Sequence, residues 1–110
     1  MKLIKSVTVM AVLTLCFSVA FAAGSAADGR KLFNDPALAG SQNDMSCNTC
    51  HPEGRKLENA GTRDYSTGTG AKSLEDMINI CITNPLKGKA LPVDSVEMQD
   101  LVAYIKSLGK

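Results

Sequence analysis

The segment that most constrains this chain is the heptapeptide SCNTCHP, residues 46–52. It contains Cys47 and Cys50, followed directly by His51, the only histidine in the sequence. A zinc site could take Cys81 as a fourth ligand, but a histidine next to Cys50 is awkward for a tetrahedron, and zinc sites usually place the second ligand pair much further on. A redox-active disulfide between Cys47 and Cys50 is typical of chains with a βαβ pattern, which is absent here. Both common uses of paired cysteines are therefore disfavoured.

The spacing C-x-x-C-H is instead the signature of covalent c-type haem attachment. Two cysteines three residues apart on a turn of helix can bond to the two vinyl groups along one edge of the porphyrin. The next residue then lies beneath the iron and offers an imidazole nitrogen as its proximal ligand. The motif predicts one haem c, bound covalently through Cys47 and Cys50, with His51 as a metal ligand.

The first 22 residues have the pattern of a secretory signal peptide. Lys2 and Lys5 form a basic start, residues 7–19 form an apolar run, and Ala20-Phe21-Ala22 supplies the small-x-small cleavage site. Acylation at Cys16 is a less suitable alternative, because Leu15 stands where lipoprotein processing needs a small residue. We therefore expect removal of residues 1–22, a mature domain of residues 23–110 without a membrane span, and a periplasmic location.

Composition narrows the range of partners. Removal of Lys2 and Lys5 leaves ten Lys and Arg against eleven Asp and Glu, a net charge of −1. The mature chain has no basic patch, so a nucleic-acid partner is not expected. A domain of this size without tryptophan has a small core and often needs a cofactor, metal or disulfide for stability.

Three helical segments can be read in the remaining sequence, and no strand pattern is present. The first predicted helix runs from Asp28, as N-cap, toward Asn34. The second is capped by Ser73 and ends at Pro85, and the third is capped by Ser95 or Asp94 and ends at Gly109. Between the first two lies a long aperiodic stretch, residues 52–72, of the kind that wraps a ligand. The sequence therefore predicts an all-α fold.

With the motif in place, the mature chain resembles the single-haem class I cytochromes c. In that family an N-terminal helix crosses a C-terminal helix through a glycine and an aromatic residue on the first and apolar and aromatic residues on the second. Gly29 and Phe33 match the first pair, and Leu101 and Tyr104 match the second. The resemblance implies the class I cytochrome c fold, with three or more helices wrapped around one covalently bound haem.

The sequence departs from that family at the position of the second iron ligand. Most members have a methionine before a proline ahead of the last helix, and here Leu91 precedes Pro92. Met98 and Met77 lie on helical stripes where methionine usually fills a core. Cys81 also lies on a buried stripe, where an isolated cysteine is usually inert.

A second, narrower resemblance bears on this choice. Residues 73–108, SLEDMINICITNPLKGKALPVDSVEMQDLVAYIKSL, are similar to the haem domain of thiosulfate dehydrogenases and related sulfur-oxidising cytochromes. In those proteins the cysteine of the helix that corresponds to residues 73–85 binds the haem iron, and that cysteine matches Cys81. The resemblance therefore implies Cys81 as the distal iron ligand, with Met98 as the alternative.

Two functions follow from these observations. The first is an electron carrier that cycles between Fe(II) and Fe(III) and meets redox partner proteins, such as another cytochrome. It is not an enzyme and has no catalytic residue, because the only histidine is used by the iron. The second is a haem subunit of a thiosulfate-oxidising or other sulfur-oxidising enzyme, which the narrower resemblance implies. A ligand-sensing haem with a labile distal site is a minor third possibility. We expect the carrier.

Overall fold

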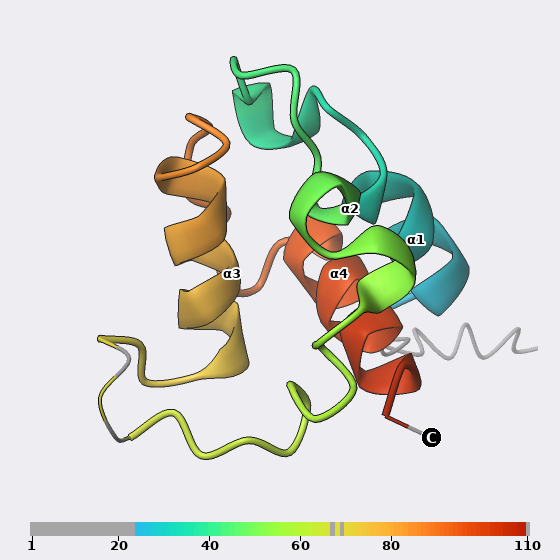
Figure 1. Cartoon of the computed structure of the whole chain (residues 1–110), viewed down its shortest axis with the longest axis vertical. Coiled ribbons are helices and arrows are strands. Elements are labelled where there is room, and N and C mark those ends of the chain that lie inside the picture. Colours follow the sequence, from blue (N-terminus) through green and yellow to red (C-terminus); the bar gives the residue numbers. More distant parts are fainter. Residues whose placement is uncertain (1–23, 67, 69, 110) are drawn as a thin grey trace, which may run out of the picture.

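The computed structural model describes residues 24–66, 68 and 70–109. The predicted signal peptide and its cleavage site lie outside these residues. The described part contains α-helices and short 3₁₀ turns and no strand (Figure 1), as the sequence predicts. None of its helices has the length and apolar character needed to cross a bilayer. The elements, in chain order, are α1 (Ala26–Phe33), η1 (Leu38–Gly40), α2 (Cys47–Cys50), η2 (Pro52–Gly54), α3 (Leu74–Thr83) and α4 (Val96–Ser107).

A serine caps each of the three longer helices. The hydroxyl groups of Ser73 and Ser95 accept hydrogen bonds from backbone amides at the start of α3 and α4, as predicted. The predicted N-cap of α1 was wrong, because it lay three residues too far along the chain. Ser25, not Asp28, is the cap, and its hydroxyl accepts from the Asp28 N–H at 3.1 Å. Asp28 instead lies in the first turn, where its negative charge interacts favourably with the helix dipole.

Helices α1 and α4 cross closely and form the base of the fold. Gly29 of α1 lies so near α4 that a Cβ atom there would overlap the carbonyl oxygen of Asp100. Phe33, one turn further, packs edge-on against Tyr104 with ring centroids 5.1 Å apart. Both contacts agree with the helix crossing that the resemblance to the class I cytochromes c implies. The crossing is therefore set by a backbone contact that only glycine permits.

A buried carboxylate adds a second link between the same helices. Asp100 is 8% exposed, and its Oδ1 accepts a hydrogen bond from the Ser25 N–H at 2.7 Å. This bond satisfies one of the amides at the start of α1 that have no partner within the helix. The N-terminal end of α1 is thus fixed to the first half of α4.

Helix α3 lies on the other side of the molecule from α1 (Figure 1) and packs against α4 much less extensively than α1 does. Its buried stripe consists of Leu74, Ile78 and Ile82. These side chains join the core formed by α1 and α4, which includes the fully buried Phe33 and Leu101. One cavity is lined from both helices, by Leu74 and Ile78 of α3 and by Leu101 and Ile105 of α4.

We expect Gly29→Ala to lower the free energy of unfolding of the haem-loaded protein by about 2 kcal/mol, since overlap at a close-packed contact outweighs the better helix propensity of alanine. Urea denaturation measures the change. Lys31→Ala, on the exposed face of the same helix, is the control and should change stability by less than about 0.5 kcal/mol. Equal stability of the two variants would contradict the close crossing.

Candidate haem site

The C-x-x-C-H motif forms one short turn of helix, α2, with its two cysteines facing the same side. A reciprocal capping box fixes its start: the Ser46 side chain interacts with the Thr49 backbone, and the Ser46 N–H donates to the Thr49 hydroxyl at 3.0 Å. Cys47 and Cys50 begin and end the helix, so their side chains lie one turn apart. This is the geometry that the motif predicts for attachment along one porphyrin edge.

His51 follows the end of α2, and a backbone carbonyl fixes its tautomer. Its Nδ1 lies 3.0 Å from the carbonyl oxygen of Arg55. A carbonyl oxygen can only accept, so Nδ1 carries the proton and Nε2 keeps a free lone pair. A histidine that binds a metal typically donates its other ring N–H in this way. The ring is therefore prepared to offer Nε2 as a ligand.

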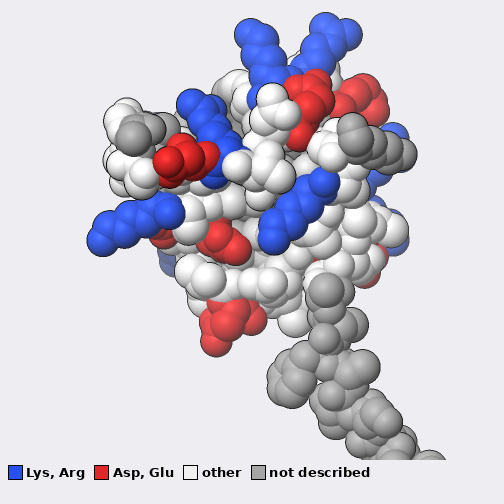
Figure 2. All heavy atoms as spheres, turned by 90° about the horizontal axis from the view of Figure 1, so that it is seen from below, with Lys and Arg blue, Asp and Glu red and all other residues white. Residues whose placement is uncertain are grey.

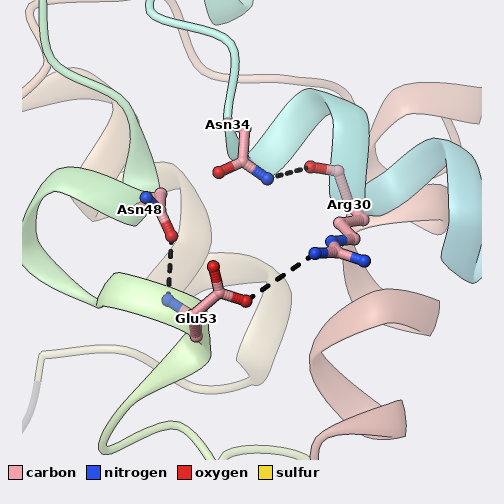
Figure 3. Close-up of polar contacts among 4 residues, drawn as sticks. All are labelled: Arg30, Asn34, Asn48 and Glu53. Carbon is pink, nitrogen blue, oxygen red and sulfur yellow. Dashed lines mark hydrogen bonds and ion pairs between the residues drawn. The ribbon is translucent and has the colours of Figure 1, made fainter.

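The turn after His51 is held from two sides. The Asn48 side chain accepts from the Glu53 N–H at 2.9 Å, and Glu53 has the left-handed φ of 54° that is uncommon for a residue with a side chain (Figure 3). The Glu53 carboxylate lies 3.7 Å from the Arg30 guanidinium of α1, and both side chains are exposed. Such an exposed pair adds little stability, so of these two side-chain contacts the Asn48 bond restrains the turn more. Backbone hydrogen bonds from the Gly54 N–H to the His51 carbonyl oxygen and from the Arg55 N–H to the Pro52 carbonyl oxygen also close it.

The three motif side chains face an apolar cavity of about 310 Å³. Helix α2 supplies one part of its wall and α3 another, through Met77, Ile78 and Cys81. The core side chains Phe33 and Leu101 also line it. The remaining lining residues are Ser46, Leu57, Ala60, Tyr65, Leu74, Pro85, Leu86 and Ile105. An almost wholly apolar cavity with an imidazole and three thiols on its wall, two of them from one C-x-x-C turn, has the chemistry that a covalently bound haem requires, so these residues fit that group.

The structure separates the candidates for the distal ligand. Cys81 lines the same cavity as the three motif side chains. Met98, the alternative, is fully buried in the core and does not line the cavity. Leu91, at the position of the usual methionine, packs against the core and also does not line it. Met77, which the sequence suggested as core filler, does face the cavity.

Burial affects the thiols on the cavity wall. Desolvation by burial, reinforced by the nearby Cys81 and Cys50 thiols, raises the pKa of Cys47 to about 11. Burial, with a smaller contribution from Cys50, also raises the pKa of Cys81. None of the three cysteines of the described part forms a disulfide bond. Among the described residues, no group of three or more His, Cys, Asp or Glu side chains is placed to hold a metal ion. Cys81 would therefore bind iron as a thiolate only where the iron's positive charge offsets this cost.

Tyr65 lies in the long segment before α3, and its hydroxyl forms a hydrogen bond with the backbone of the same segment. The hydroxyl donates to the Ala60 carbonyl oxygen at 2.7 Å, and the ring lines the cavity. The Arg63 guanidinium lies 6.0 Å from the ring centroid. This bond holds part of the segment beside the cavity.

Comparison with known proteins identifies the family. Residues 28–110 match the model of the cytochrome c domain of SoxA/TsdA proteins. The chain belongs to this family. It therefore has a haem electron-transfer role, with covalently bound haem c as its cofactor. The family match agrees with the class I cytochrome fold that the first resemblance implies and with the narrower resemblance to sulfur-oxidising cytochromes.

One solved structure supports the fold. The crystal structure of SoxXA from P. pantotrophus matches 76% of this chain with a TM-score of 0.59 and 21% sequence identity. The match covers 31% of the SoxXA chain, so this protein spans about a third of that chain's length. No curated protein sequence is significantly similar.

Proposed function

We propose that this protein is an exported, periplasmic c-type cytochrome with one haem, which carries electrons between partner proteins by Fe(II)/Fe(III) cycling. The observation that carries the proposal is the common cavity: Cys47, Cys50, His51 and Cys81 all line one apolar space in a cytochrome c domain. The proposed location rests on the signal-peptide pattern of residues 1–22.

In this proposal each side chain has a separate task. Cys47 and Cys50 hold the cofactor by thioether bonds, and His51 binds iron through Nε2 while the Arg55 carbonyl keeps its ring in place. The apolar lining excludes water, which limits the reorganisation that accompanies a change of charge. When bound, haem supplies a one-electron couple, and the chain sets its potential through ligands and burial.

Partner proteins rather than nucleic acid suit the surface. The face in Figure 2 carries Lys and Arg side chains interspersed with Asp and Glu, without a patch of one sign covering the face. Cys50 is exposed at the cavity wall, so the attached edge of the cofactor would lie near the surface. Redox partners, such as another cytochrome, could approach there for electron transfer.

The proposed distal ligand is Cys81. It lies on α3, a helix separate from α2 (Figure 1). Cys81 lines the cavity, whereas Met98 and Leu91 do not. An anionic thiolate favours ferric iron and lowers the reduction potential relative to histidine–methionine ligation. We therefore expect a low-potential haem.

Cys81→Ala should abolish the low-spin histidine–thiolate signals in the electron paramagnetic resonance spectrum of the ferric protein, because the variant lacks the sulfur ligand. Met98→Leu, which keeps the core volume, is the matched control and should leave these signals unchanged. Loss of the signals in Met98→Leu but not in Cys81→Ala would assign the ligand to Met98.

The family favours a second candidate, a haem subunit of a thiosulfate-oxidising or other sulfur-oxidising enzyme, in which Cys81 lies near the chemistry. The sequence has one C-x-x-C-H motif and one histidine, so such an enzyme would need a further electron acceptor. A haem-bearing partner would serve that purpose.

One assay distinguishes the electron carrier from the sulfur-oxidising enzyme. Two thiosulfate ions joining as tetrathionate release two electrons, which two ferricyanide ions can accept. The purified protein as an isolated carrier should form tetrathionate no faster than the Cys81→Ala variant, which is the control. Turnover well above that variant would replace the carrier with the enzyme.

A further inference from the structure

The side chain of Asn79 links α3 to the segment that precedes α4. Its Nδ2 donates to the Leu91 carbonyl oxygen at 2.9 Å, and its Oδ1 accepts from the Leu91 N–H at 2.7 Å. Both bonds are partly buried and join residues twelve apart. Asn79 does not line the cavity, so its contacts serve the backbone and not a ligand.

This pair of bonds connects α3 indirectly to the start of α4. Immediately after Leu91, the Pro92 carbonyl oxygen accepts from the Ser95 N–H at 3.0 Å and from the Ser95 hydroxyl at 2.6 Å. Ser95 is in turn the N-cap of α4. Because α3 packs directly against α4 only sparsely, the chain Asn79–Leu91–Pro92–Ser95 is a substantial part of what holds the two helices in register.

The link fixes two features of the cavity wall. Cys81 lies two residues after Asn79 on a helix with few other direct contacts to α4, so its orientation depends on the orientation of α3. Leu91, at the position of the family's usual methionine, is held at its backbone and packs against the core outside the cavity. The Asn79 side chain thus holds Cys81 at the cavity wall and holds Leu91 outside the cavity.

We propose that Asn79 is a positioning residue for the iron's distal ligand: its paired hydrogen bonds to Leu91 hold α3 in the orientation that presents Cys81 to the cavity. This inference rests on the proposed function, because it takes Cys81 as the distal ligand. A carboxamide is required, since it alone among similar side chains donates to the carbonyl and accepts from the N–H of one residue at once.

The chain offers a matched control in the same segment. Gln99 of α4 donates from Nε2 to the Val93 carbonyl oxygen at 2.7 Å. This is also a bond from a carboxamide to the backbone before α4, but it comes from α4 itself and does not involve α3. Removing it loosens the same segment without releasing α3, so the control separates general loss of stability from loss of ligand positioning.

The test compares haem-loaded wild type, Asn79→Ala and Gln99→Ala. With α3 released, the Asn79→Ala protein should bind added imidazole at its ferric iron about tenfold more tightly, the equivalent of one net hydrogen bond of about 1.4 kcal/mol. Its reduction potential should rise as the thiolate is held less firmly. Gln99→Ala should match wild type in both measurements.

Asn79→Asp keeps an acceptor for the Leu91 N–H but loses the donor to its carbonyl oxygen. It should shift both measurements in the same direction, and it serves as the test if Asn79→Ala does not fold. Wild-type imidazole affinity and potential in the Asn79 variants, or equal shifts in Gln99→Ala, would overturn the proposal. Absence of histidine–thiolate signals from wild type itself would instead overturn the assignment of Cys81.

Discussion

The structure depends on how a small core encloses a cavity that its own side chains do not fill. An unfilled apolar cavity of about 310 Å³ leaves its lining side chains without packing partners, which destabilises a domain of this size. Water is a poor filler for a space lined by Phe33, Leu101 and Ile105. A large apolar group bound there therefore stabilises the fold as well as serving its function. A haem bound in this cavity would complete the hydrophobic core.

The two sides of this core are built differently. Helices α1 and α4 meet through a glycine contact, an aromatic pair and the bond from Ser25 to Asp100, none of which has freedom to shift. Helix α3 is held mainly by its buried stripe and by the link from Asn79 to Leu91. The proposed histidine ligand follows α2, where the Arg55 carbonyl oxygen holds its ring. The proposed thiolate ligand lies on α3, whose orientation we infer to depend on the link from Asn79 to Leu91.

Local patterns predicted much of this arrangement. The motif turn and the approximate ends of α3 and α4 follow from spacing and capping preferences that involve near neighbours in sequence. The α1–α4 crossing joins distant residues, and its prediction came from the resemblance to the class I cytochromes c. The start of α1 was misplaced because Ser25 and Asp28 are both good caps, and the choice is decided by the bond from the Ser25 N–H to the distant Asp100.

Features that depend on tertiary contacts were not predicted. The left-handed turns at Ala39 and Glu53 lack the glycine that would signal them at those positions. The link between Asn79 and Leu91 depends on how a loop returns to a helix, and no periodic pattern encodes it. Met77 and Met98 look alike in sequence, yet Met77 faces the cavity, whereas Met98 is fully buried in the core one turn before Leu101, which does line the cavity.

Covalent attachment of haem to this chain is the central claim. The most direct measurement is the absorption spectrum of the reduced, pyridine-treated protein after maturation with export and haem-attachment machinery, followed by extraction of loose haem. The account predicts one haem per chain that resists extraction, with Cys47 and Cys50 protected from alkylation. A colourless protein in which both thiols are alkylated would contradict it.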